Sequence, residues 1–114
     1  MRCAVLEADR RQRFLELQRA FLDDAAADVA ELLALLNGQS MGTDTRRCCR
    51  VIAHNLRGTG ASYGYAQISD AAACLENALD TGGAESDVWA FALRLREAVA
   101  ICDGSLCLGR QPAC

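Results

Sequence analysis

His54 is the only histidine in the chain of 114 residues, and its helical neighbourhood is unusual. At about 100° per residue, a helix brings five other residues within about 60° of it: Arg47, Arg50, Arg57, Gly58 and Ala61. The opposite side of the same helix carries the residues expected to face a core: Cys48, Ile52, Leu56 and Thr59. This pattern predicts that His54 stands on the solvent side, among guanidinium groups.

Such a surface is suited to carrying a phosphoryl group. A neutral imidazole nitrogen is a competent nucleophile near pH 7, and nearby cations disfavour the protonated ring. The same guanidinium groups favour a dianion on that nitrogen through charge-assisted hydrogen bonds. Gly58 costs the helix about 1 kcal/mol relative to Ala, and its missing side chain leaves room for another protein's active site. Ala61 extends that clearance.

Structural explanations of the same residues stay open at this point. A surface histidine among arginines is commonly a solvated helix face, and a glycine within a helix also permits close helix packing. Arg50 could pair with acidic residues of a neighbouring helix instead of with a ligand.

Composition predicts an all-α fold. The chain has 21 Ala and 15 Leu against only 8 Val plus Ile, and its one proline is Pro112, which favours helices over strands. Apolar periodicity predicts helices over about 8–36, 43–61, 65–80 and 86–103, with a break near Leu22–Ala25 and N-caps at Thr43 and Ser86. Short loops between them predict an antiparallel up-and-down four-helix bundle over residues 1–103. Residues 104–114 are expected to form a flexible tail.

Charge and cysteine content exclude several classes of partner. A net charge of −3 argues against nucleic acid and acidic membrane surfaces, and no apolar segment approaches the roughly 20 residues that cross a bilayer. The seven cysteines form no C-x-x-C pair, so neither a metal site nor a disulfide framework is expected. We expect buried, reduced thiols in a cytoplasmic protein, with Cys107 and Cys114 the most exposed.

The string from residue 53 to residue 64 resembles the motif of the histidine-containing phosphotransfer (HPt) domain family. That motif is roughly Ala-His-x-Leu-Lys-Gly, a Gly ten residues after the His, and a leucine-rich helix ending in Leu-Glu. The four predicted helices extend the similarity over most of residues 8–103. The residues that carry the resemblance are Ala53-His54-Asn55-Leu56-Arg57-Gly58, Gly64, Ile68, Ala71, Leu75 and Glu76.

The resemblance implies a role for each chemical position. His54 would be phosphorylated on the ring nitrogen remote from the backbone. Arg57, where the family usually has Lys, would keep the charge but contact the phosphoryl oxygens with a different reach. Gly58 would admit the partner, and Gly64 would make the turn into the next helix. The helical arc itself adds three further surface residues: Arg47, Arg50 and Ala61.

The resemblance also implies partners. The chain would take a phosphoryl group from an aspartyl-phosphate on the receiver domain of a hybrid histidine kinase and pass it to the receiver of a response regulator. Magnesium would belong to the receiver, and the chain would need no cofactor of its own. It has no Gly-rich phosphate loop or Walker motif for ATP. Met1 lies close to the first predicted helix and no other domain fits, so a free-standing HPt protein is expected. A monomer is expected because the bundle closes its own core.

Three alternatives remain beside this interpretation. A histidine-kinase-like dimerisation hairpin also carries a phospho-acceptor His, but it usually has an acidic residue next, where this chain has Asn55. A non-catalytic helical adaptor would make His54 incidental. A haem or metal bundle would need a second strong ligand, and the chain has no second histidine.

Overall fold

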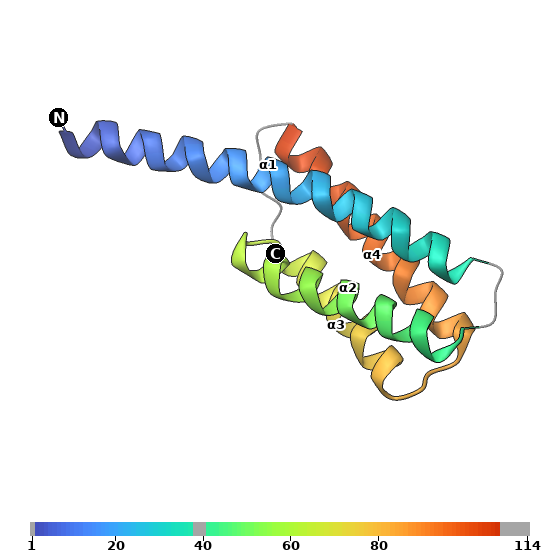
Figure 1. Cartoon of the computed structure of the whole chain (residues 1–114). Coiled ribbons are helices and arrows are strands. Elements are labelled where there is room, and N and C mark those ends of the chain that lie inside the picture. The colour runs from blue at the N-terminus through green and yellow to red at the C-terminus, as the bar shows by residue number, and fades with distance from the viewer. Residues whose placement is uncertain (1, 38–40, 108–114) are drawn as a thin grey trace.

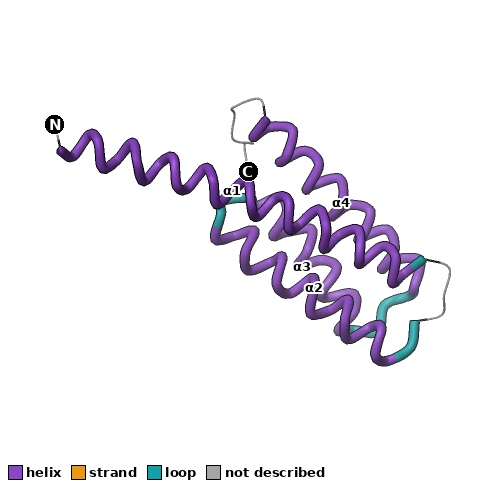
Figure 2. The backbone as a smooth tube through the Cα atoms, turned by 45° about the horizontal axis from the view of Figure 1, so that its top comes forward, coloured by secondary structure: helices purple, strands orange, loops and turns teal. Residues whose placement is uncertain are grey.

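The computed structural model describes residues 2–37 and 41–107, and within them it contains four helices and no strand. The helices are α1 (Arg2–Leu36), α2 (Thr43–Ser62), α3 (Ala66–Asp80) and α4 (Glu85–Cys107). They run up and down alongside one another, as Figures 1 and 2 show. The prediction of an all-α four-helix bundle is therefore confirmed.

Several predicted helix ends were wrong. α1 continues without a break through Leu22–Ala25, because both of these residues are buried and regular helix keeps them in the core. Gly42 in an extended conformation occupies the N-cap of α2, with Thr43 as the first helical residue. α4 begins at Glu85, before Ser86, and includes residues 104–107, which the sequence placed in the tail. The rest of that tail, 108–114, lies outside the described residues.

The core is one cluster of buried side chains to which all four helices contribute. Small residues on every helix let the backbones approach closely, since Ala25, Ala53, Ala72 and Ala92 are fully buried. Larger side chains fill the space between them: Leu22, Leu32, Leu56, Tyr65, Ile68, Leu75 and Leu95. This packing fixes α2 and α3 as neighbouring, rigid elements.

The first half of α1 projects beyond the other helices (Figure 1). The described structure measures 59 × 22 × 20 Å, far longer than it is wide. The apolar periodicity that predicted a helix over residues 8–36 includes Phe14 and Leu17 and places them on the face expected to be buried, yet they are 43% and 51% exposed. That prediction was wrong at these positions because the helical stripe continues past the end of the bundle.

An aromatic cluster joins α1 to the turn between α2 and α3. The ring of Phe21 stacks on Tyr63 at 5.2 Å and on Tyr65 at 5.9 Å between centroids. The buried Gln18 side chain donates a hydrogen bond from Nε2 to the carbonyl oxygen of Tyr63 at 3.0 Å. These contacts hold the ends of α2 and α3 in register, which matters for the residues that the two helices bring together.

The cysteines divide into two groups. Cys49 and Cys102 are buried, as expected for small hydrophobic residues. Cys48 and Cys74 are exposed, so the expectation of burial was wrong for these two. The predicted exposure of Cys107 and Cys114 concerns side chains outside the described part of the structure.

Candidate functional site

The buried face of α2 is formed by Cys49, Ala53, Leu56 and Gly60. The sequence instead predicted Cys48, Ile52, Leu56 and Thr59. The observed buried face is therefore turned about the helix axis by somewhat less than the roughly 100° between successive residues. The reason is size: Ala53 is fully buried and Gly60 lies against Ile68 and Ser69 of α3, yet residues this small carry little apolar signal in the sequence. His54 lies well away from both versions of this face.

His54 is exposed, with 68% of its side chain accessible to solvent. Its Nδ1 lies 2.7 Å from Oε2 of Glu76 on α3. A neutral ring with the proton on Nδ1 donates this bond, which leaves the lone pair on Nε2. The outer nitrogen is then the nucleophilic atom, and the inner one orients the ring.

Glu76 is the residue around which the site is built. Its side chain is only 12% exposed, and its Oε1 accepts a hydrogen bond from Nη1 of Arg57 at 3.0 Å. Burial opposes ionisation of this carboxyl, but the hydrogen bonds from Arg57 and His54 outweigh it and lower the pKa of Glu76. Glu76 is therefore a carboxylate at neutral pH, and it holds the two key α2 side chains with one oxygen each.

A second row of contacts continues along the same α2–α3 seam. Arg50 Nη1 lies 3.4 Å from Oδ1 of Asp80, one helical turn after Glu76. Arg46 donates to the carbonyl oxygens of Leu79 and Gly83 at 3.1 and 3.3 Å. Arg50 thus pairs with a neighbouring helix, which is the structural alternative that the sequence left open. The predicted basic arc is partly neutralised by carboxylates of α3.

The remaining predicted positions are open to solvent. Arg47, Gly58 and Ala61 are exposed, and a Cβ built on Gly58 would meet no atom within 4 Å. Close helix packing therefore does not explain Gly58, since the space beside it is empty of this chain. Gly64 lies in the turn between α2 and α3 with φ +83°, a conformation that favours glycine.

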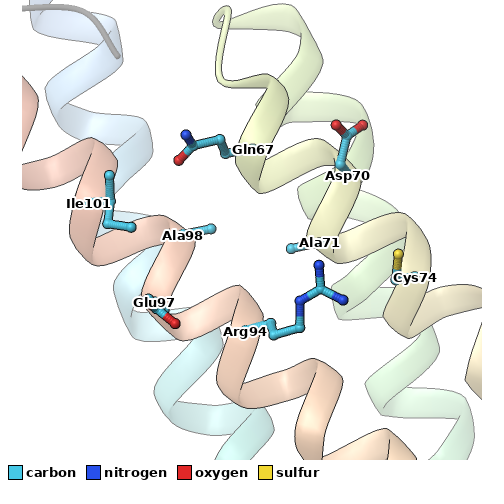
Figure 3. Close-up of a pocket in the computed structure, with 8 residues that line it drawn as sticks. All are labelled: Gln67, Asp70, Ala71, Cys74, Arg94, Glu97, Ala98 and Ile101. Atoms are coloured by element: carbon cyan, nitrogen blue, oxygen red, sulfur yellow. The ribbon is translucent and has the colours of Figure 1, made fainter. Parts of the chain in front are cut away.

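The described surface also contains pockets. A hollow of about 270 Å³ is lined by Arg50, Val51, His54 and Glu76, and Val51 is an exposed apolar residue beside the imidazole. A larger one, about 360 Å³, lies between α3 and α4, where Arg94 of α4 and Cys74 of α3 are among the lining residues (Figure 3). His54 does not line it, so the imidazole's surroundings are those of the first hollow.

A comparison with known protein families assigns the chain to a family. A family model described as the Hpt domain matches residues 16–102. The chain belongs to the Hpt domain family. Neither the curated proteins nor the solved structures yield a match.

Membership of the Hpt family assigns the general activity. Hpt domains perform histidine phosphotransfer in phosphorelays and interact with receiver domains of kinases and response regulators. The match covers α2 and α3 completely and most of α1 and α4. It favours this interpretation over the histidine-kinase-like hairpin and the haem or metal bundle.

The described residues contain neither a metal-binding cluster nor a membrane-spanning helix. In the ranges 2–37 and 41–107, no group of three or more His, Cys, Asp and Glu is placed to hold a metal ion. No described helix of this Hpt domain is long and apolar enough to span a membrane.

Sequence reasoning missed the structural role of Glu76. The residue was noted only as the end of the Leu-Glu part of the motif, although it contacts both His54 and Arg57. A signal was present: Glu76 follows Leu75, a core residue of α3, so it lies at the edge of the buried face. What the sequence could not supply was the register of α3 against α2.

Proposed function

We propose that His54 is the phospho-acceptor of this Hpt domain and that its Nε2 takes the phosphoryl group. The donor is an aspartyl-phosphate on the receiver domain of a hybrid histidine kinase, and the acceptor is an aspartate on the receiver of a response regulator. The supporting observation is the exposed imidazole whose Nδ1 is held by Glu76 at 2.7 Å. That bond directs reactivity to the outer nitrogen.

The transfer balances without a cofactor bound to this chain. Nε2 attacks phosphorus while the bond between phosphorus and the donor's aspartate oxygen breaks, which regenerates the donor carboxylate. The ring keeps its Nδ1 proton and becomes positively charged, and the Glu76 carboxylate beside it stabilises that charge. In the second step the acceptor's carboxylate attacks phosphorus and neutral His54 leaves. Magnesium on the receiver supplies charge neutralisation around the phosphoryl oxygens.

Arg57 is proposed to exchange partners during transfer. Its guanidinium is 56% exposed and is held by Glu76 one helical turn from His54, so its side chain is close enough to reach a phosphoryl group on Nε2. A guanidinium binds phosphoryl oxygens through parallel hydrogen bonds. Arg50 and Arg47 would add positive potential at the edge of the docking surface, a smaller effect because exposed charges are screened.

Gly58 and Ala61 are proposed to be the access positions. Each lies within one or two turns of His54 on the exposed side of α2. A receiver must bring its aspartate within bonding distance of Nε2, so side chains beside the ring would obstruct it. We also propose a cytoplasmic location, supported by the free thiols of Cys48, Cys49 and Cys74.

The direct test is transfer of label from a phosphorylated receiver to this chain. We expect an acid-labile, base-stable adduct on the wild type and none on His54→Gln, with unchanged circular dichroism for the variant. Arg96→Gln on α4, an exposed arginine outside this surface, is a matched control that should retain labelling. If several receivers gave no adduct, or if His54→Gln were labelled like the wild type, the proposal would fail.

A further inference from the structure

The first half of α1 projects from the bundle (Figure 1) and exposes several large apolar side chains. It also begins before residue 16, where the match to the Hpt family starts. Five large hydrophobic residues in this half are exposed: Val5, Leu6, Phe14, Leu15 and Leu17. Such exposure is typical of a surface that another protein covers.

One face of α1 separates its charges along the helix. Residues at steps of three and four share a face, and we name one such set the α1 stripe. Its first half carries two arginines, its middle is apolar, and its second half is acidic. The α1 stripe consists of Leu6, Arg10, Arg13, Leu17, Ala20, Asp24, Asp28 and Glu31.

The α1 stripe is complementary to itself when reversed. Arg13 and Asp24 lie equally far from the peptide bond between residues 18 and 19, and so do Leu17 and Ala20. Arg10 and Asp28 are centred on residue 19. Two antiparallel copies related by a two-fold axis at this point would therefore place each arginine beside an aspartate, twice over. A parallel arrangement would instead oppose arginine to arginine.

The acidic half of the stripe borders a hollow into which a helix could pack. A pocket of about 370 Å³ lies between α1 and α2, and its lining includes Leu17, Ala20, Asp24 and Asp28. Burial, and then the neighbouring charges of Asp24 and Glu31, raise the pKa of Asp28. Cations at this position would relieve that accumulation of negative charge.

We propose that two copies of this chain associate through the α1 stripe as an antiparallel, two-fold symmetric dimer. The projecting half of each α1 covers the groove between α1 and α2 of the other copy. Leu17 of one copy packs on Ala20 of the second, and Arg10 and Arg13 pair with Asp28 and Asp24 across the interface. This replaces the monomer expected from the sequence.

The dimer leaves the phosphotransfer site open. On α2 the pocket is lined by Asn55, Leu56 and Thr59, whereas His54 is turned towards Glu76 of α3. Each copy therefore retains an accessible imidazole. Because the α1 stripe and the His54 site are separate surfaces, failure of one proposal does not imply failure of the other.

The test is sedimentation equilibrium of the full chain at low ionic strength. We expect a dimer for the wild type that dissociates as salt is added, since the ion pairs are exposed to screening. The double variant Arg10→Glu/Arg13→Glu and the double variant Asp24→Arg/Asp28→Arg should each be monomeric, because like charges then face one another. An equimolar mixture of the two should form a heterodimer, because their altered charges are complementary.

The control is Arg94→Glu/Arg96→Glu on α4, which changes the net charge as much as Arg10→Glu/Arg13→Glu does but away from the stripe, and should leave the dimer intact. Equal helicity by circular dichroism shows that each variant folds. A wild type that stays monomeric at millimolar concentration would overturn the proposal. So would charge variants that dimerise like the wild type, or a mixture that remains monomeric.

Discussion

Two glycines of α2, two residues apart, show how differently the two faces of one helix are used. A Cβ on Gly60 would lie 3.1 Å from the backbone nitrogen of Ser69 and 3.3 Å from Cγ2 of Ile68. A Cβ on Gly58 would meet nothing within 4 Å. The first glycine is required by packing between α2 and α3. The second lowers helix stability and makes no packing contact within this chain, which is understandable if the open space admits a docking partner.

Filling the open space beside Gly58 should have the largest effect on phosphotransfer. We expect Gly58→Leu to slow transfer from a phosphorylated receiver roughly 100-fold, about 2.7 kcal/mol of activation free energy, because the side chain obstructs approach to His54. Its thermal stability should not fall. Gly104→Leu is the matched control, since Gly104 is also helical with no neighbour within 4 Å of a built Cβ. If both variants transferred at the wild-type rate, the space beside Gly58 would have no role in docking.

Removing the Arg57 guanidinium from the exposed face of α2 should have the next largest effect on the transfer rate. We expect Arg57→Ala to slow transfer about tenfold, or about 1.4 kcal/mol, because the phosphoryl oxygens lose a hydrogen-bonding partner. The helical content should be unchanged, as measured by circular dichroism, because the Arg57 side chain is more than half exposed. Loss of the helices in this variant would instead identify Arg57 as a structural residue.

Adding one methyl group to each glycine should change the free energy of unfolding in opposite directions on the two faces. Gly58→Ala is expected to raise the free energy of unfolding by about 1 kcal/mol, the usual gain in helix propensity. Gly60→Ala should lower it by about 1 kcal/mol, because overpacking against Ser69 and Ile68 exceeds that gain. Urea denaturation measures both. Equal and positive shifts would show that α3 adjusts to the added methyl without cost.

The smallest expected effect concerns acid stability of the seam between α2 and α3. Because the folded structure lowers the pKa of Glu76, its ionisation contributes stability above its ordinary pKa, about 4.3. That contribution is lost as the pH falls through the lowered value. The wild type should therefore exceed Glu76→Gln in free energy of unfolding at pH 7, and the difference should shrink on acidification. A difference independent of pH would contradict this assignment.

The sequence predicted the exposed face of α2 better than its buried face. Arginines and a histidine at helical spacing indicate a solvated surface, so the exposure of His54 was predictable. Ala53 and Gly60 are buried because they are small, and apolar periodicity gives such residues little weight. The contacts of Glu76 required the register between two helices, which local pattern does not encode. For α1, the periodicity was real, but only part of the helix has a bundle to pack against.

The central claim concerns one atom, Nε2 of His54. Nuclear magnetic resonance of the phosphorylated, ¹⁵N-labelled chain locates the phosphoryl group through coupling between phosphorus and the ring nitrogens. We expect phosphorus on Nε2, with Nδ1 still protonated and hydrogen-bonded to Glu76. Phosphorus on Nδ1, or on any residue other than His54, would contradict it.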